Sequence, residues 1–264
     1  MLGSTVNRLG VTNTNQFNPA TFFADGTQGA WYDMSDRSTM FKVDGTTPAV
    51  LGQAVGKILD KSGNGHHLVQ TVEDKCPVLR RDDLGSTCLD FVSDDGMRTL
   101  NVIPFETDGN TTAMSVMTAA RKESTGLNQT VAELSNSVGG NQGAFRIFCT
   151  SGELLRAIQK GTIANSLSTV GIGNPSRFIL TSVANMSTPR HLFRRNGTVV
   201  TDSGSTLGTA PYKDHLLSIG GRAGGLSANL DGKIYALVVV GKEITAQQIL
   251  DVEGYMSDKL GVSF

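Results

Sequence analysis

Apolar and polar residues alternate along most of the chain between residues 29 and 240. Short stretches with apolar side chains at every second position are separated by turns rich in glycine, asparagine and aspartate, a pattern typical of half-buried β-strands. Strands are expected over residues 29–32, 55–59, 87–92, 113–120, 130–134, 145–149, 154–159, 177–184, 216–220 and 233–240. The sequence therefore predicts an all-β fold.

The turn at residues 196–197 gives the clearest hairpin signal. The stretch HLFRRNGTVV (191–200) places Asn196 and Gly197 between two segments of strand composition. These two residues tolerate the positive φ angles of a type I′ turn, whose twist matches that of the flanking strands. We expect a tight antiparallel hairpin at this point.

The strand expected over 233–240 is apolar on both faces. One face would carry Ile234, Ala236, Val238 and Val240, and the other Tyr235, Leu237 and Val239. Such a strand is expected at the centre of a sheet that is covered on both sides.

One α-helix is expected at the carboxyl end. Thr245 and Gln248 have the spacing of a capping box, and Gly261 stands at the position of a C-cap. Apolar residues recur between them at helical spacing, namely Ile249, Val252, Met256 and Leu260. We expect this apolar stripe to pack across an end of the sandwich.

Length and composition fit a single sandwich domain. The chain has 264 residues, of which 31 are glycine, and 18% of the residues are charged. All-β domains of this size are common. Residues 1–20 are polar without a hydrophobic period, so an extended amino-terminal arm is expected there and the sandwich domain over 21–264.

Charge and hydropathy exclude several classes of partner. The formal net charge is −1 and no stretch is strongly basic, so nucleic acid is not expected as a partner. The longest apolar run, 234–240, is too short to span a bilayer, and the first residues lack the apolar core of a secretory signal. Cys76, Cys88 and Cys149 form no CxxC pair and are interpreted as buried free thiols of a protein assembled in a reducing cytoplasm.

The stretch DKSGNG (60–65) is similar to the first half of a calcium-binding loop. Asp60, Ser62 and Asn64 supply oxygens at alternate positions, but the twelfth position holds Thr71 where a bidentate glutamate is needed. The favoured interpretation is a turn in which Asp60 and Ser62 accept hydrogen bonds from nearby backbone N–H groups. The alternative is that these oxygens help to hold a cation together with ligands from elsewhere in the chain.

Glu106 and Asp108 are candidates for the paired acids of a glycosidase. Their alternate spacing would place both carboxyl groups on one face of a strand. The second acid that a retaining enzyme needs is absent, because Gly109, Asn110 and two threonines follow. We expect this pair in a loop and expect no enzymatic activity.

The remaining candidates each have a structural and a functional interpretation. His66 and His67 are adjacent, so in an extended chain they point to opposite faces and are expected to be solvated or half-packed. Trp31 is expected in the core beside Tyr32, with stacking on a sugar as the alternative. Arginines at 194, 195 and 222 are expected on the solvated surface, with binding of acidic partners as the alternative. No catalytic, metal or cofactor-binding residue, and no cofactor, is assigned.

The order of motifs along residues 20–264 resembles that of a known family. The motifs are GAWYDMSD (29–36), ILDKSGNGHHLVQ (58–70), PVL (77–79), LDFVSDDGMRTL (89–100), AMSVMTAARK (113–122), HLFRRNGT (191–198), LSIGG (217–221) and LDGKIYALVVVGKEIT (230–245). They resemble the concanavalin A-like lectin/glucanase superfamily, and within it the laminin-G-like domains of bacteriophage structural proteins. Residues 17–41 look especially like the version in phage tail and head-fibre proteins.

This resemblance implies a fold and two functions. The implied fold is a jelly-roll-like antiparallel β-sandwich of two curved sheets. The first implied function is that of a non-enzymatic virion structural protein, as a capsid decoration, head-fibre or tail-associated subunit, assembled in the host cytoplasm as a homo-oligomer with other virion proteins. The alternative is a carbohydrate- or receptor-binding module that recognises host surface glycans. Fold alone does not choose between them.

Overall fold

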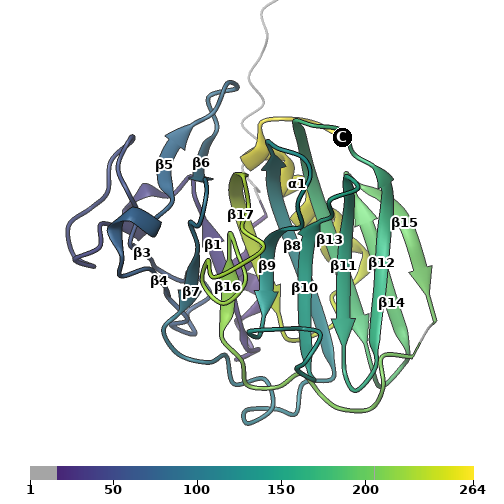
Figure 1. Ribbon diagram of the computed structural model, residues 1–264. Helices are drawn as coiled ribbons and strands as arrows, with labels where there is room; N and C mark the ends of the chain where they lie inside the picture. Colours follow the sequence, from purple (N-terminus) through teal and green to yellow (C-terminus); the bar gives the residue numbers. More distant parts are fainter. Residues whose placement is uncertain (1–16, 205) are drawn as a thin grey trace, which may run out of the picture.

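The computed structural model describes residues 17–204 and 206–264, and their strands form two antiparallel sheets packed face to face (Figure 1). Sheet A has eight strands: β15 (Thr198–Ser203), β14 (Arg190–Arg195), β13 (Ser176–Asn185), β8 (Ala113–Lys122), β17 (Gly232–Val240), β6 (Thr87–Phe91) and β5 (Val78–Arg81) in this order, with β1 (Gly29–Asp33) also paired to β17. The predicted all-β, jelly-roll-like sandwich is confirmed.

Sheet B has nine strands and forms the second layer. Its order is β12 (Ala164–Gly171), β11 (Leu154–Lys160), β10 (Ala144–Cys149), β9 (Gln129–Leu134), β16 (Leu217–Ile219), β7 (Met97–Thr99), β4 (Leu68–Val69), β3 (Lys57–Ile58) and β2 (Met40–Phe41). The strand pattern did not predict β2, β4, β5, β7 or β12. Most of these strands are too short to show a period, and the sequence of β12, ANSLSTVG, is largely polar.

The hairpin between β14 and β15 has the predicted turn. Asn196 and Gly197 have φ angles of 50° and 75°, as a type I′ turn requires. The strands pair antiparallel on either side of this turn.

Strand β17 is buried on both faces, but its two faces differ from the prediction. A β-bulge between Ile234 and Ala236 shifts the alternation by one residue. Ile234 therefore points into the core between the sheets together with Leu237 and Val239. The outer face carries Tyr235, Ala236, Val238 and Val240. This bulge arises from the pairing of β17 with β8, and the residue pattern of β17 alone does not contain that information.

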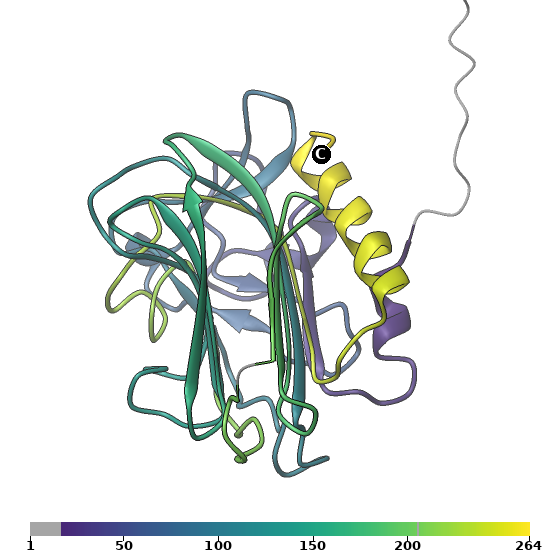
Figure 2. The same ribbon diagram turned by 90° about the vertical axis from the view of Figure 1, so that its right-hand side faces the viewer.

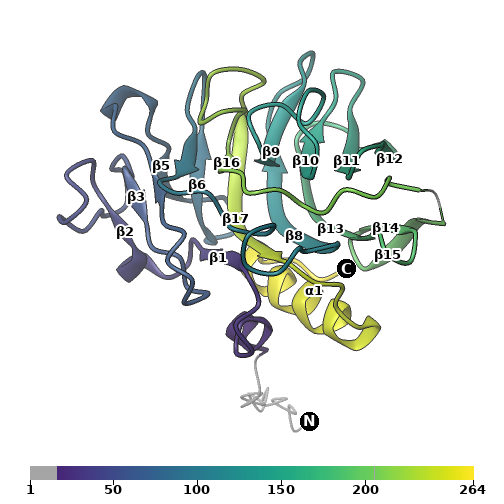
Figure 3. The same ribbon diagram turned by 90° about the horizontal axis from the view of Figure 1, so that it is seen from below.

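Helix α1 (Ala246–Leu260) lies on the outer face of sheet A, not across an end of the sandwich (Figures 2 and 3). Its predicted capping box and its left-handed C-cap, Gly261 at φ 70°, are both present. The apolar stripe packs on the outer residues of β8, β13 and β17, with which it forms a second buried cluster. The prediction of an end position was wrong because the helix itself is the cover of the apolar outer face of sheet A, the second cover that strand 233–240 was expected to need.

The segment before β1 also covers this outer face. A 3₁₀ turn, η1 (Pro19–Phe22), is capped by the Asn18 side chain, and Phe22 and Phe23 join the cluster under the helix. Two further turns, η2 (Arg37–Thr39) and η3 (Glu73–Lys75), lie in connections. Residues 1–16 of the predicted arm lie outside the described residues, so the boundary between arm and domain stays a prediction.

The three cysteines are buried and free, as expected. Burial raises the pKa of each thiol to about 12, which leaves all three protonated and unreactive near neutral pH. Within residues 17–204 and 206–264, no helix is long and apolar enough to cross a membrane.

Truncation of Met256 to alanine should test the role of the helix. Met256 is fully buried against sheet A, so Met256→Ala should lower the free energy of unfolding by about 2–5 kcal/mol. Leu250 lies on the same helix with 53% of its surface exposed, and Leu250→Ala should cost less than about 1 kcal/mol. Urea unfolding measures both, and equal costs would contradict the packing described.

Candidate functional site

The helix does not cover the outer face of sheet B, but the central strands β9, β10 and β16 of this sheet are buried on both faces. The inner faces of both sheets form one core, and α1 covers the outer face of sheet A. Figure 2 shows the helix on one side of the molecule and sheet B on the other. If a sheet surface binds a ligand, sheet B is therefore the one expected to do so.

Strand register places a row of polar side chains across this face. Arg98 on β7 pairs with Ser218 on β16, Ser218 pairs with Glu133 on β9, and Glu133 pairs with Arg146 on β10. Directly paired residues in adjacent strands point to the same face of a sheet. Met97 and Ile219, which neighbour this row in sequence, point into the core instead.

Glu133 is the buried centre of the row. Its carboxylate accepts hydrogen bonds from the Val138 backbone N–H at 2.6 Å and from Arg222 Nε at 2.8 Å and Nη2 at 3.2 Å. Arg146 Nε lies 3.8 Å from the second carboxylate oxygen. This acid therefore joins the loop after β9, the loop after β16 and the sheet itself.

Arg146 lies in the same row, paired with Glu133 across strands β10 and β9. Burial lowers its pKa to about 10, and its guanidinium still carries its charge at neutral pH. It donates two hydrogen bonds to Thr130 Oγ1, at 3.1 Å and 2.7 Å, and stacks 4.1 Å from the centre of the Phe148 ring.

Three donors on or beside this row lack a partner in the described part of the chain. Arg98 is exposed and makes no side-chain hydrogen bond or ion pair there. Ser218 is 1% exposed with an unpartnered Oγ, and Arg156 has a buried, unpartnered Nε. Buried donors normally find acceptors. Ser218 Oγ and Arg156 Nε are buried, so Arg98 is the exposed donor among these three groups.

A cleft of about 400 Å³ opens beside Arg98. It lies between strands β4 and β7 and the loop that follows β16. Its polar lining includes Gln70, Thr71, Lys75 and Arg98, and its apolar lining includes Val69, Leu100 and Leu226. Leu100 and Leu226 are largely exposed, so the cleft has an apolar rim.

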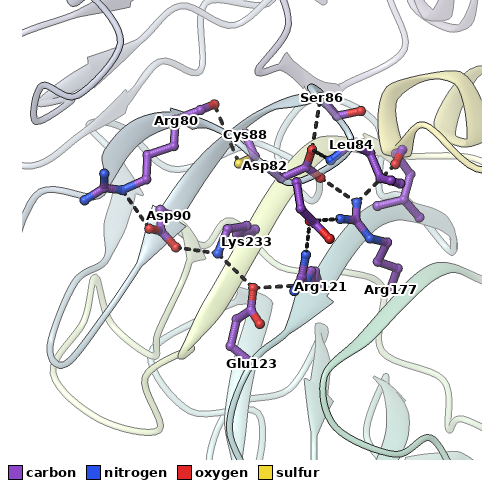
Figure 4. Close-up of polar contacts among 12 residues, drawn as sticks. Arg80, Asp82, Leu84, Ser86, Cys88, Asp90, Arg121, Glu123, Arg177 and Lys233 are labelled. Carbon is purple, nitrogen blue, oxygen red and sulfur yellow. Dashed lines mark hydrogen bonds and ion pairs between the residues drawn. The ribbon is translucent and has the colours of Figure 1, made fainter.

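A second polar cluster lies on the outer face of sheet A, beside the end of the helix (Figure 4). Contacts join Arg80, Asp90, Lys233, Glu123, Arg121, Asp83, Arg177 and Asp82 in that order. Four cationic groups thus meet four carboxylates, and each cation has at least one acidic partner. This cluster is neutral overall and attaches strands to one another.

The DKSGNG stretch is a turn held by its own side chains, as the favoured interpretation states. Asp60 accepts hydrogen bonds from the backbone N–H groups of Trp31 at 2.9 Å, Ser62 at 2.9 Å and His66 at 3.0 Å. Asn64 Nδ2 donates to the carbonyls of Thr27 and Gly29. The turn therefore supplies hydrogen bonds to the edge of β1 that does not pair with β17.

No group of three or more His, Cys, Asp or Glu side chains that could hold a metal occurs within the residues that the structure describes. His66 and His67 do not converge. His66 Nε2 lies 3.4 Å from Gln28 Oε1, whereas His67 Nδ1 accepts the Asp60 backbone N–H at 3.1 Å.

The acid pair lies in a turn, as expected. Glu106 forms an ion pair with Lys213, and Asp108 accepts a hydrogen bond from Gln28 at 3.0 Å. The two carboxylates therefore have separate partners.

Trp31 is buried, which confirms the packing interpretation. Its ring N–H donates to Tyr255 of the helix at 3.0 Å. It does not pack beside Tyr32, which points to the opposite face of β1 and into the core. Trp31 is thus unavailable for stacking on a sugar.

The arginines at 194, 195 and 222 are half-buried, so the prediction of a solvated position was wrong. Arg194 binds both carboxylate oxygens of Glu253 on the helix, each at 2.9 Å. Arg222 binds Glu133 as described. Both acidic partners are distant in sequence, which explains why the local pattern missed them.

The core contains a Ser–His–Asn arrangement that sequence reasoning also missed. Ser182 Oγ lies 3.0 Å from His191 Nε2, and His191 Nδ1 lies 2.8 Å from Asn165 Oδ1. Ser182 and His191 are fully buried, and Gln159 Nε2 donates to Ser182 Oγ at 3.0 Å. Nucleophilic catalysis needs access for a substrate, which the burial of Ser182 denies.

No protein-family model and no curated protein matches this sequence. The fold is similar to that of a botulinum neurotoxin type C structure described in connection with cell entry and two ganglioside molecules, with a TM-score of 0.58 and 14% identity over 87% of this chain and 51% of that one. It is equally similar to the binding domain of botulinum neurotoxin DC in complex with rat synaptotagmin II, with a TM-score of 0.58 and 13% identity over 87% of this chain and 52% of that one.

These similarities concern the fold. The chain spans about half the length of each of these two structures. The shared architecture is the lectin-like, two-sheet jelly roll expected from the concanavalin A-like resemblance. The phage part of that resemblance has no counterpart among these structures and stays a prediction.

Substitution of Asp60 should reveal its structural role. Asp60→Ala would leave three backbone N–H groups without their acceptor and should lower the free energy of unfolding by about 2–4 kcal/mol. Asp44 accepts comparable bonds in an exposed turn, and Asp44→Ala should cost less than about 1 kcal/mol. Added calcium should not change the melting temperature of the wild type. A calcium-dependent rise that Asp60→Ala abolishes would contradict this interpretation.

The buried imidazole of His191 should make stability depend on pH. Burial lowers the pKa of His191 from 6.5 to about 4, so between these values the unfolded chain binds a proton that the folded chain does not. The free energy of unfolding should therefore fall by up to about 3 kcal/mol as the pH falls through this window.

Asp95 acts in the opposite direction, because burial raises its pKa from 3.8 to about 6. The pH dependence of the wild type alone thus combines both effects. Urea unfolding of the wild type and His191→Gln at several pH values separates them. The stability difference between the two proteins should change between pH 6.5 and 4, and a constant difference would refute the assignment.

Proposed function

We propose that this protein is a non-catalytic carbohydrate-binding module that recognises surface glycans of a host or receptor through the outer face of sheet B. The observation that carries the proposal is the cleft at Arg98, which combines an exposed guanidinium that has no acidic partner among the described residues with an apolar rim. Ligand sites are typically concave and combine apolar walls with a few polar groups that fix orientation.

The chemistry of the cleft suits a sugar. Thr71 and Arg98 present hydroxyl and guanidinium groups that can bond ring hydroxyls. The Gln70 amide already donates to the Gly96 carbonyl and accepts from the Val72 N–H. Val69, Leu100 and Leu226 offer apolar surface for the C–H faces of a ring. Both kinds of contact lie within one cleft of about 400 Å³.

The structural similarity supports binding rather than catalysis. The similar toxin structures are described by interaction with gangliosides and with synaptotagmin. The acid pair at Glu106 and Asp108 is engaged in separate contacts, and the Ser182 hydroxyl is closed off in the core. These observations favour the carbohydrate-binding alternative over a purely structural role.

Virion attachment is a separate proposal that rests on the sequence resemblance alone. A place in a phage particle, assembly in the host cytoplasm, homo-oligomerisation and contacts with other virion proteins are all compatible with glycan binding. A receptor-recognising subunit on a particle would combine the two functions.

Replacement of Leu226 should test the binding face. Leu226→Asn removes apolar surface from the rim, and binding to any glycan retained on an array should weaken about tenfold. Leu250→Asn is the matched control, because Leu250 is exposed on the helix at the opposite side of the molecule. Titration calorimetry with the retained glycan gives the dissociation constants. Absence of any bound glycan, or equal loss in both variants, would refute the proposed function.

A further inference from the structure

Arg98 is a cation without a counter-ion among the described residues. Its neighbours across the strand pairs are Val69 and Ser218, neither of which can neutralise it. Lys75, the other cation in the cleft, already forms an ion pair with Asp94 at 2.9 Å. The Arg98 guanidinium therefore keeps its full capacity for hydrogen bonds.

The surrounding sheet face has an excess of positive charge. Its strands and the loop after β16 contribute the guanidinium groups of Arg98, Arg146, Arg156 and Arg222. Glu133 is the carboxylate that contacts two of them, Arg146 and Arg222. Arg156 lies 5.9 Å from the Phe148 ring centre without an acidic partner in the described chain. These four cations thus outnumber the one carboxylate, but Arg146 is 7% exposed, so the unpaired charge that a ligand meets at the cleft is that of Arg98.

The loop after β16 holds Arg98 in place. Gly224, at φ 77°, lies so close to the Arg98 stem that a Cβ atom at this position would come within 3.3 Å of Arg98 Cδ. The backbone of the loop therefore packs on the aliphatic part of the side chain and leaves the guanidinium at the cleft. A side chain whose aliphatic stem is packed loses less conformational entropy when it binds a ligand than a side chain that rotates freely.

The hydroxyl of Ser218 is a buried donor next to Arg98 in the strand register, and it does not line the cleft. It lies directly between Arg98 and Glu133 in the strand register and has no partner in the described residues. A buried hydroxyl without a partner costs free energy that a ligand or water oxygen would recover.

We propose that the cleft binds an acidic sugar, with a carboxylate or sulfate group on the Arg98 guanidinium. The proposal rests on the proposed glycan-binding function and names the class of glycan. A planar guanidinium can bond two oxygens of either anion at once, and the apolar rim at Leu100 and Leu226 contacts the rest of the sugar.

The cluster on sheet A provides an internal comparison. Arg80 is also about half-exposed, but its Nε lies 2.8 Å from Asp90 Oδ2. An anion that bound Arg80 would have to compete with this carboxylate, and one that bound Arg98 would not. Arg37 and Arg81 are also exposed without an ion pair among the described residues, so an unpaired guanidinium alone does not define the site. Arg98 differs from them because it lines a cleft with an apolar rim.

The experiment uses three polymers with the intact chain. Polygalacturonate supplies carboxylates, dextran sulfate supplies sulfates, and unmodified dextran is the neutral reference, all at about 0.15 M salt to screen weak long-range attraction. Titration calorimetry compares the wild type with Arg98→Ala, Arg98→Lys and the matched control Arg80→Ala. Circular dichroism and melting temperatures verify that each variant is folded.

The wild type should bind at least one acidic polymer and bind dextran at least tenfold more weakly. Arg98→Ala should weaken acidic binding at least tenfold, Arg98→Lys should restore only part of it, and Arg80→Ala should leave it unchanged. Preference for the carboxylate or the sulfate polymer identifies the anion.

Three outcomes would overturn this inference. Equal binding of acidic polymers to the wild type, Arg98→Ala and Arg80→Ala would show non-specific attraction. If neutral glycans bind in a Leu226-dependent manner and neither acidic polymer binds, the proposal of an acidic ligand is refuted and the proposed glycan-binding function is retained. Absence of binding to acidic and neutral glycans alike would refute both.

Discussion

Burial of sheet A on both faces is the constraint on which the arrangement of this molecule depends. Strand β17 carries apolar side chains on each side, so one face must pack on sheet B and the other needs a second cover. Helix α1 and the segment around Phe22 supply that cover. The described part of the chain has one α-helix, and it lies on sheet A, so loops cover the buried central strands of sheet B. The cleft beside Arg98 lies next to this covered part, at β4 and β7.

Local signals predicted much of the fold. The Asn196-Gly197 turn, the capping box at Thr245 and most alternating strands depend on residues close in sequence, and all of these appear in the structure. Non-local events limited the rest. The bulge beside Tyr235 depends on pairing with β8, and the position of the helix depends on how much of sheet A is apolar on its outer face.

The candidate site could not be predicted in the same way. Arg98, Arg146, Arg156 and Arg222 are widely separated in sequence, and only the strand register brings them to one face. Their sequence neighbours give no hint that Arg98 lacks an acidic partner while Arg222 has one. The overall charge of −1 conceals both the positive face of sheet B and the neutral cluster on sheet A. The Ser182–His191 contact could not be predicted from the sequence either, because the two residues lie diagonally opposite each other on the neighbouring strands β13 and β14.

The loop between Arg222 and Ser227 has a fixed base and an open tip. Its ends pair with each other, the Arg222 side chain is bound to Glu133, and Leu226 at the tip is largely exposed. When the ends of a loop are already held together, extra residues in it add conformational entropy cost only slowly with length. Insertions and exchanges at this tip would therefore remodel the wall of the cleft while leaving the sheet intact. Such an arrangement would let the shape of the cleft vary at little cost to folding.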